Sequence, residues 1–314
     1  MTTLITTTTK ALVVTAAVAL LAACGGGSDG DKSQTGLLKL SITDAPMDDV
    51  QEVWVKFSAV EFKPEGGAPV LNPLAPAQSL NLLELRDGRT AVLVNGVILP
   101  AGRYEWIRLV VDNVPNVRDS YVMANGAECE LIVPSGAESG LKMNRGFTLP
   151  ADGSVALTVD FDLRKSLHAP PGQKSMMETC TQGYLLRPTL RLVQDSEVGA
   201  IAGTIDPSRF SGVVGCVPSV YVFAGSVTPD DDDGDGDSVI AVTPDTTGGS
   251  NVAAPYKATF LPPGNYTVAY TCNGDKDDPA TDDSASVIFD ADNKAATVQT
   301  NLITTVNFGP LPAP

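Results

Sequence analysis

The chain has 314 residues, of which 43% are hydrophobic and 18% charged, a composition that indicates a folded protein long enough for two domains. Its 37 Asp and Glu residues outnumber its 21 Lys and Arg residues, so the formal net charge is −16. Because phosphate groups are bound by clusters of basic residues, this charge argues against nucleic acid as a partner and against anionic membrane surfaces. The acidity instead suits high solubility or the binding of divalent cations.

The N-terminal segment is predicted to be a targeting sequence. Residues 11–23 form an apolar run of 13 residues, too short to span a bilayer and typical of a signal peptide. The run ends in the letters LAAC, at residues 21–24. This ending resembles the lipobox of bacterial lipoproteins, which implies that a signal peptide of residues 1–23 is removed and that Cys24 is lipidated. The alternative is an ordinary secretory signal with an unmodified Cys24.

Residues 24–36 are predicted to form a flexible tether, because glycine and serine are frequent in them. Such a segment has an r.m.s. reach on the order of 20 Å. Several acyl chains on one residue give stable anchoring, so the expected partner at this end is a membrane. By the same resemblance, Gly25 after the cysteine implies the outer membrane. The expected location is the bacterial cell envelope.

Residues 37–194 contain short runs of alternating apolar and polar residues, which predict half-buried β-strands. The clearest run is 154–163, whose outward side chains are expected to be Thr158, Asp160 and Asp162. Its inward side chains are expected to be Val155, Leu157, Val159, Phe161 and Leu163. The other expected strands are 37–43, 50–62, 104–112 and 184–193, and a short helical turn is possible at 82–86.

Four segments of this region carry a family resemblance. They read LSITDAPMDDVQEVWVKFSAVEF from residue 40, LPAGRYEWIRLVVDN from 99, VDFDLRKSLH from 159 and LRPTLRLV from 186. Together they resemble the bacterial lipoprotein family of domain of unknown function 4382, over about residues 37–193. The resemblance implies a β fold and a place in the envelope, and no activity.

A second β unit is predicted over residues 199–308, after a short polar bridge. Its letters LPPGNY at 261–266 predict a turn set by proline and glycine, with Tyr266 packed back into the core. With strands at 199–205 and 220–225, the unit resembles the carboxypeptidase-regulatory-like module, a prealbumin-like β-sandwich. The expected fold class is therefore all-β, with two antiparallel β-sandwich-like domains after the signal peptide and the tether.

Four cysteines remain after Cys24, namely Cys129, Cys180, Cys216 and Cys272. An even number in an exported protein predicts two disulfide bonds, for which three connectivities are possible. If a domain boundary follows residue 194, the pairs are Cys129 with Cys180 and Cys216 with Cys272. Each bond would then be worth about 4 kcal/mol by the loop-entropy relation. A metal site is the alternative, but the zinc-type CxxC spacing is absent.

The candidates for catalysis are few. His168 is the single histidine, and the sequence contains no Gly-x-Ser-x-Gly motif, so a surface or strand-end position is the preferred interpretation of His168. Asp160 and Asp162 could act as a glycosidase pair. If the closing strand lies beside 154–163, however, Arg187 and Arg191 would pair with these carboxylates, and this structural interpretation is preferred.

The acidic loop 229–238 is a candidate calcium site. Asp231, Asp233 and Asp235 match the first half of a calcium loop, but Val242 stands where the closing glutamate is expected. The hypothesis is a weak calcium site, with no other cofactor expected; the alternative is a solvated loop. A second acidic loop follows Cys272, and pairing of Cys216 with Cys272 is expected to place it at the opposite end of the sandwich.

Exposed aromatic residues would be needed to bind carbohydrate by stacking. Tyr256, Tyr270 and Phe223 are candidates in the second unit, although core packing is their default role. Trp54 and Trp106 could form an exposed patch or the core of a second layer.

The predicted function is that of a non-enzymatic, membrane-anchored lipoprotein acting in adhesion, ligand capture or envelope assembly, with an unknown protein or glycan as ligand. The alternative is a carbohydrate-binding or hydrolytic protein that uses Asp160 and Asp162.

Overall fold

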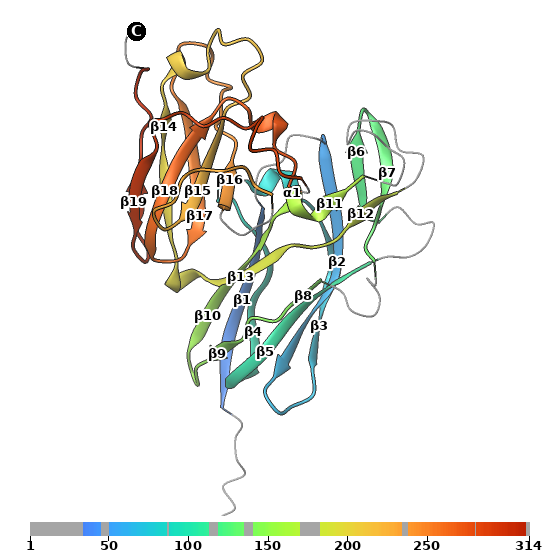
Figure 1. The fold of residues 1–314 in the computed structure, drawn as a ribbon. Coiled ribbons are helices and arrows are strands. Elements are labelled where there is room, and N and C mark those ends of the chain that lie inside the picture. The colour runs from blue at the N-terminus through green and yellow to red at the C-terminus, as the bar shows by residue number, and fades with distance from the viewer. Residues whose placement is uncertain are drawn as a thin grey trace, which may run out of the picture. The chain divides into compact units, whose positions relative to one another are not determined.

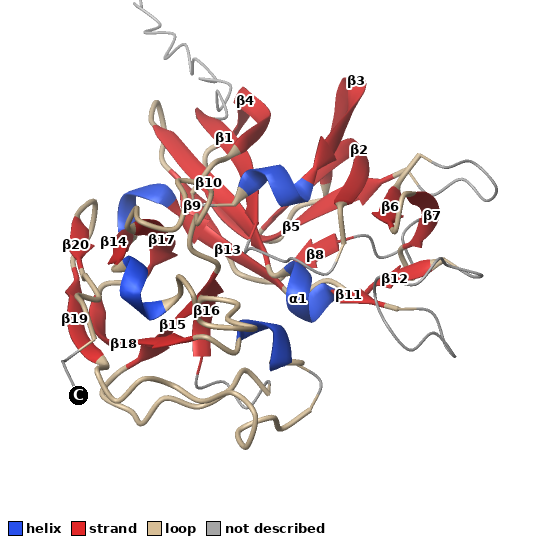
Figure 2. Ribbon diagram, turned by 90° about the horizontal axis from the view of Figure 1, so that it is seen from above, coloured by secondary structure: helices blue, strands red, loops and turns tan. Residues whose placement is uncertain are grey.

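The computed structural model describes residues 34–311, except for residues 45–49, 87, 113–118, 135–140, 170–182, 234–237 and 280. Nearly all regular structure in these ranges is β-sheet, which confirms the predicted all-β class (Figure 1). The described residues lie in one compact unit that begins at Gln34. The helical segments are single turns (Figure 2). They are η1 (Leu82–Leu85), α1 (Leu163–Ser166), η2 (Asp195–Glu197), η3 (Pro207–Arg209) and η4 (Gly274–Lys276).

Residues 35–194, which we call the first β region, form two sheets. Sheet 1 has the order β13 (Leu190–Gln194), β10 (Ser154–Phe161), β1 (Thr35–Asp44) and β4 (Ala91–Pro100). The pairs β1–β4 and β10–β13 are antiparallel, whereas β1 and β10 are parallel. The parallel pair differs from the expected antiparallel pattern, and it is possible because the chain between these strands forms most of the second sheet before it returns.

Sheet 2 is centred on the long strand β2 (Glu52–Pro64). One edge of β2 pairs with β3 (Val70–Asn81), and the other pairs in succession with β6 (Tyr121–Ala124) and β5 (Gly102–Val111). The remaining strands of this sheet are β7 (Ala127–Ile132), β8 (Leu141–Met143), β9 (Phe147–Leu149), β11 (Leu167–His168) and β12 (Tyr184–Leu186). A β-bulge between Phe57 and Ala59 keeps the apolar side of β2 turned inward along its whole length.

The inner faces of sheets 1 and 2 share one hydrophobic core. The expected inward residues of β10 are all buried in it, from Val155 to Phe161. The outward residues Thr158 and Asp160 are buried as well, so the prediction that they face solvent is wrong. Thr158 donates a hydrogen bond to Asp195 at 2.7 Å, and Asp160 lines a pocket with Ile240. Later segments of the chain therefore cover the outer face of β10, which the alternation of β10 cannot reveal.

Residues 199–308, which we call the second β region, form two smaller sheets over a separate core, in agreement with the sandwich that the resemblance implies. Sheet 3 has the order β17 (Ala254–Leu261), β14 (Gly199–Ile205) and β20 (Ile303–Thr305). Sheet 4 has the order β16 (Ser238–Val242), β15 (Ser219–Ala224), β18 (Gly264–Thr271) and β19 (Lys294–Val298). Tyr266, in β18, is buried, and its hydroxyl donates to the carbonyl of Pro262 in the preceding turn at 2.7 Å, as the LPPGNY turn predicts.

Candidate functional site

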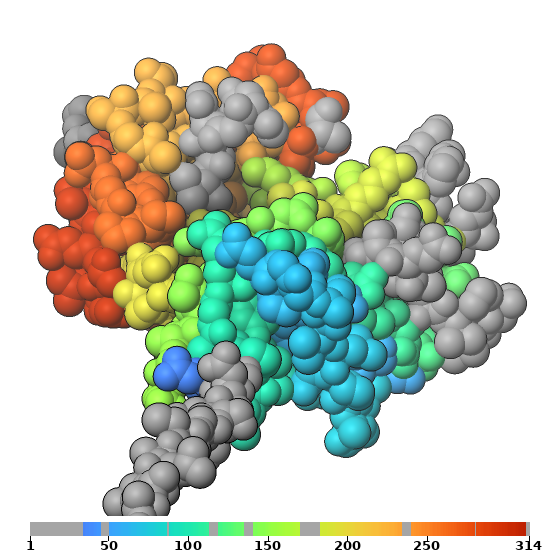
Figure 3. Space-filling view, turned by 90° about the horizontal axis from the view of Figure 1, so that it is seen from below, coloured from blue at the N-terminus to red at the C-terminus, as the bar shows by residue number. Residues whose placement is uncertain are grey.

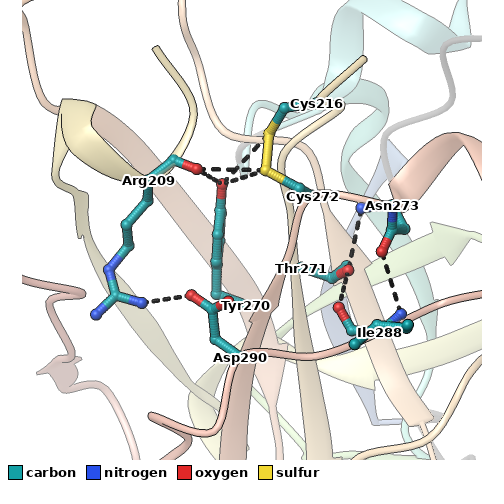
Figure 4. The surroundings of a disulfide bond; sticks show 8 residues. All are labelled: Arg209, Cys216, Tyr270, Thr271, Cys272, Asn273, Ile288 and Asp290. Atoms are coloured by element: carbon teal, nitrogen blue, oxygen red, sulfur yellow. Dashed lines mark hydrogen bonds and ion pairs between the residues drawn. A yellow bond between two sulfur atoms is a disulfide. The ribbon is translucent and has the colours of Figure 1, made fainter. Parts of the chain in front are cut away.

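A disulfide bond joins Cys216 and Cys272, as the sequence predicts (Figure 4). It links the segment before β15 to the residue that follows β18. The hydroxyl of Tyr270 lies 3.3 Å from Sγ of Cys272 and donates to the carbonyl of Arg209 at 3.2 Å. Cys129 is also disulfide-bonded, and its expected partner, Cys180, lies outside the described residues.

Arg209 is the buried cation of this disulfide neighbourhood, with a side chain only 1% exposed. Its Nη1 lies 2.5 Å from Asp290, its Nη2 lies 2.7 Å from Asp292, and its Nε donates to the carbonyl of Gly309 at 2.6 Å. The guanidinium also lies over the ring of Phe308, 5.6 Å from its centroid. Arg209 therefore ties the last segments of the second β region to its core.

The segment 273–288, which we call the disulfide loop, is fixed at both ends next to the disulfide bond (Figure 4). The hydroxyl of Thr271 donates to the carbonyl of Ile288 at 2.7 Å and accepts from the amide of Asn273 at 3.0 Å. The side chain of Asn273 in turn accepts from the amide of Ile288 at 3.3 Å. These bonds bring the two ends of the loop together at the end of β18.

The two acidic loops of the second β region contact each other, so the prediction that they lie at opposite ends of the sandwich is wrong. The amide of Asp232 donates to Oδ1 of Asp277 at 3.1 Å, and the amide of Asp283 donates to Asp231. The prediction assumed that both strands are straight, so that each loop would lie beyond the end of its own strand. Instead the loop after β15 turns back across the outer face of sheet 4, where Val227 packs on a small apolar cluster of Tyr221, Phe223, Ala241, Ala269 and Phe289.

Asp277 connects this folded-back loop to the first β region. Its carboxylate side chain is 0% exposed. Its Oδ2 accepts hydrogen bonds from Arg164 of α1, at 2.5 Å, and from the hydroxyl of Tyr221 in β15. Nη2 of Arg164 also donates to the backbone carbonyl of Asp277 at 3.3 Å. One buried carboxylate thus binds three different segments of the chain.

A second ion pair lies beside the first. Lys165 Nζ is 2.7 Å from Oδ1 of Asp232, which is buried, and 3.7 Å from Asp162. Asp162 caps α1 by accepting a hydrogen bond from the Lys165 amide at 3.2 Å, and this cap helps to fix the turn that carries both cations. We call the set of Arg164, Lys165, Tyr221, Asp232 and Asp277 the inter-region ion cluster.

Burial and charge act together on the groups of this cluster. Burial raises the pKa of Asp232, although the hydrogen bond from Lys165 opposes the effect. Burial also raises the pKa of Tyr221, so its hydroxyl keeps the proton that it donates to Asp277. Burial by itself would lower the pKa of Arg164, but Tyr221 and Asp277 outweigh it and the pKa is raised. Arg164 therefore stays charged inside the interface.

The polar bridge between the two β regions is docked on the first of them. The hydroxyl of Thr158 donates a hydrogen bond to Asp195. Nη2 of Arg145 lies 3.4 Å from Glu197, and Nη1 of Arg145 donates to the carbonyl of Leu192 at 2.8 Å. A pocket of about 330 Å³ lies beside this bridge and is lined in part by Arg145 and Glu197. The bridge and the inter-region ion cluster thus connect the two β regions at separate points.

The candidate catalytic carboxylates have structural partners. Arg191 pairs with Asp160 through Nη2 at 2.5 Å and Nε at 3.2 Å, as expected for neighbouring strands. Burial raises the pKa of Asp160, and the charge of Arg191 opposes this shift. Asp160 and Asp162 line a common pocket of only about 150 Å³, below the roughly 300 Å³ at which small-ligand pockets begin.

His168 and Arg187 lie near each other, away from that ion pair. His168 is half-buried in β11, where it pairs with Leu185 of β12, so it occupies a strand end. Burial lowers the pKa of His168, and the nearby charge of Arg187 lowers it further. The expected pairing of Arg187 with the two aspartates is therefore wrong. The expected closing strand 184–193 is split into two, and Arg187 follows β12, which pairs in sheet 2, whereas of these two only β13 pairs with β10.

The calcium hypothesis for the acidic loop is untested. Asp231 and Asp232 are buried, which the solvated-loop alternative does not predict, and both already have hydrogen-bond or ion-pair partners. Asp235 lies outside the described residues. Among the residues that are described, no group of three or more His, Cys, Asp or Glu could hold a metal ion. A calcium site that includes Asp231, Asp233 and Asp235 stays a prediction.

The aromatic candidates divide by region. Tyr256, Tyr270 and Phe223 are core residues of the second β region, so none offers an exposed ring. Trp54 and Trp106 lie half-buried on the outer face of sheet 2. Trp54 stacks on Tyr121 with ring centroids 6.2 Å apart, and Lys142 Nζ lies 4.5 Å from the ring centroid of Trp106.

Comparisons with solved structures found several low-similarity matches. They include the TIE protein of Bacillus anthracis (11% identity, 87% of this chain and 33% of that chain, TM-score 0.20) and the minor pilin GBS52 of Streptococcus agalactiae (9% identity, 88% and 97%, TM-score 0.20). A fimbrial protein of Bacteroides ovatus matches with 8% identity, 88% and 49% coverage and a TM-score of 0.24. The chain spans a third or less of the first two structures found. Such low TM-scores assign neither an overall fold nor a function.

A search of the curated proteins found no match. No helix in the described ranges is long and apolar enough to cross a membrane.

The model of the family described as "Domain of unknown function (DUF4382)" matches residues 35–188, close to the range that the sequence motifs indicate. Residues 35–188, and with them most of the first β region, belong to this family of domains of unknown function.

Proposed function

We propose that this protein is a non-catalytic lipoprotein of the bacterial cell envelope, in which the two β regions act as one rigid unit for adhesion, ligand capture or envelope assembly. The observation that supports a single rigid unit is the buried Asp277 carboxylate, which binds Arg164 of the first β region and Tyr221 of the second. A buried charge pair of this kind is costly to break, because separation leaves an unpaired charge inside the protein. The two regions therefore stay together.

Two separate domains are also part of this proposal. The first hydrophobic core draws its residues from 38–192 and the second from 201–308, which supports domains at 37–194 and 199–308. The connection between them is polar and charged, as interfaces between domains of one chain commonly are. We infer that the domains fold around their own cores and are then locked by the inter-region ion cluster.

A non-catalytic role is supported by the state of the candidate catalytic groups. Asp160 is paired with Arg191, Asp162 caps α1, and His168 lies in a strand pair. The alternative of glycoside hydrolysis by Asp160 and Asp162 would require these groups to leave their structural partners. The test is the double variant Asp160→Asn, Asp162→Asn in a screen of glycoside substrates. Turnover by the natural protein that the folded variant lacks would overturn the non-catalytic role.

The lipid anchor is supported by the sequence at residues 11–24, since Cys24 lies outside the described residues. The experiment is detergent phase separation of the expressed full chain and of the variant Cys24→Ser. We expect the natural protein in the detergent phase and the variant in the aqueous phase. A variant that remains in the detergent phase would contradict the anchor at Cys24.

A further inference from the structure

The first β region has one end, which we call the tether end, where β1 begins at Thr35 and three turns meet. The turns are residues 65–69, 100–103 and 150–153. The amide of Asp152 donates to the carbonyl of Thr35 at 2.8 Å, and the amide of Ala101 donates to that of Gln34 at 2.7 Å. The amide of Glu65 donates to the carbonyl of Arg103 at 2.9 Å. Figure 3 looks onto this end, where the dark-blue start of β1, the light-blue hairpin of β2 and β3 and the teal turn from β4 to β5 share one surface.

The tether end has little charge for a chain with a net charge of −16. The three turns read EGGAP, PAGR and PADG, so they carry one arginine against one glutamate and one aspartate, a net charge of −1. Proline, alanine and glycine supply all their other residues. This end of the molecule therefore presents mostly small, weakly polar groups.

Two large apolar side chains are exposed beside these turns. Leu37 is 47% exposed and Ile98 is 67% exposed, and the two are cross-strand partners in β1 and β4. Both lie on the outer face of sheet 1, each two residues from the end of its strand, at Thr35 and Pro100 respectively. Elsewhere on this outer face, the side chains of Thr158 and Asp160 in β10 are covered by later segments of the chain and buried. The apolar pair is left uncovered at the end where the tether joins.

We propose that the tether end rests on the lipid surface that holds Cys24, with Leu37 and Ile98 in contact with the membrane interface; this inference rests on the lipid anchor of the proposed function. Only ten residues separate Cys24 from Thr35. A Gly- and Ser-rich segment of that length has an r.m.s. reach on the order of 20 Å, so the anchor keeps this end near the bilayer. Apolar side chains favour the interface, and the low charge of the turns limits electrostatic repulsion from a lipid surface.

The test uses the full lipidated chain in phosphatidylcholine vesicles, with and without bromine atoms on the acyl chains. Bromine quenches the fluorescence of tryptophan that contacts the lipid. In a Trp54→Phe, Trp106→Phe background, the substitution Ile98→Trp should give weaker emission in brominated vesicles than in plain ones. Val214→Trp is the matched control, because Val214 is fully exposed, at 101%, in a turn of the second β region. Its emission should be the same in both kinds of vesicle.

A second measurement needs no change to the folded domains. Hydrogen–deuterium exchange of the amides at residues 96–101 should be slower in the natural chain on vesicles than in Cys24→Ser in solution, while residues 213–215 exchange equally in both. If the chain sediments with the vesicles but Ile98→Trp is unquenched and exchange at 96–101 is unchanged, the membrane contact is refuted and the anchor stands. If the chain does not sediment with the vesicles, the anchor itself fails. Equal quenching at positions 98 and 214 would also refute a specific membrane-facing end.

Discussion

Arg209, which is buried, and Arg164, which is partly buried, use the same chemistry for different purposes. Arg209 pairs with Asp290 and Asp292, and all three belong to the second β region. Arg164 belongs to the first β region, but it pairs with Asp277 of the second. Both guanidinium groups also lie near aromatic rings, those of Phe308 and Tyr221 respectively. The difference is that one pair closes a fold on itself, whereas the other joins two folds.

Arg209 should therefore stabilise the second β region, whereas Arg164 should couple the unfolding of the two β regions. Loss of Arg209 should weaken the second β region itself, because the disulfide neighbourhood and the last strand segments depend on it. Loss of the Arg164 pair should leave each core intact and free the two regions to unfold or move independently. The predictions below test this separation, from the largest expected effect to the smallest.

The largest effect is expected for Arg209→Met. The substitution leaves Asp290 without its cation, while Asp292 keeps Lys294. It should lower the free energy of unfolding by about 3 kcal/mol, the lower end for a broken buried pair, because both carboxylates are partly exposed. Urea denaturation followed by circular dichroism measures the change. Arg103→Met is the control, since Arg103 and Glu65 are both well exposed and 3.9 Å apart. Equal stability of the two variants would contradict a structural role for Arg209.

An intermediate effect is expected for the pair of Lys165 and Asp232. A double-mutant cycle with Lys165→Met and Asp232→Asn should give a coupling energy of about 1 kcal/mol, because Asp232 is buried whereas Lys165 is partly exposed. The same cycle on Arg103 and Glu65 should give a coupling energy near zero. A coupling energy of zero for both pairs would show that Lys165 does not hold the second β region.

The smallest effect concerns pH. Burial raises the pKa of Asp232 in the folded protein despite its bond to Lys165. A carboxyl with a raised pKa binds its proton more tightly in the folded state. Its contribution therefore favours folding increasingly as pH falls through the folded pKa towards 3.8, the ordinary pKa of an aspartate side chain. As pH falls from neutral towards 3.8, the natural protein should therefore gain more stability, or lose less, than Asp232→Asn. Identical pH dependence of the two urea midpoints would contradict a raised pKa.

Several strands of both regions follow from local patterns in the sequence. Alternation along residues 154–163 identifies the inward side of β10, and the cysteine count together with a domain boundary identifies the bond between Cys216 and Cys272. The pairing of Asp160 with Arg191 also follows, because it needs only two neighbouring strands in register. Such features depend on spacing within a strand or between strands that pair directly.

The contact between the regions could not be predicted in this way. It depends on a loop that folds back over sheet 4, and the path of a loop is set by what it packs against, here Tyr221 and Phe223 under Val227. The letters DLRKS at residues 162–166 look like a strand end, yet they form the capped turn that presents Arg164 and Lys165. The one signal in the sequence that could have indicated this contact is the adjacent pair of cations, Arg164 and Lys165, in a chain with two acidic loops and few cations.

The variant Asp277→Ala tests the central claim that the inter-region ion cluster makes the two β regions one unit. Both tryptophans, Trp54 and Trp106, lie in the first β region, so their fluorescence reports on that region, whereas circular dichroism reports on both. In the natural protein the two probes should give one coincident urea transition, as in two-state unfolding. Asp277→Ala should separate the transitions, while Asp275→Ala, an exposed aspartate of the same loop, should not. Coincident transitions in Asp277→Ala would contradict the claim.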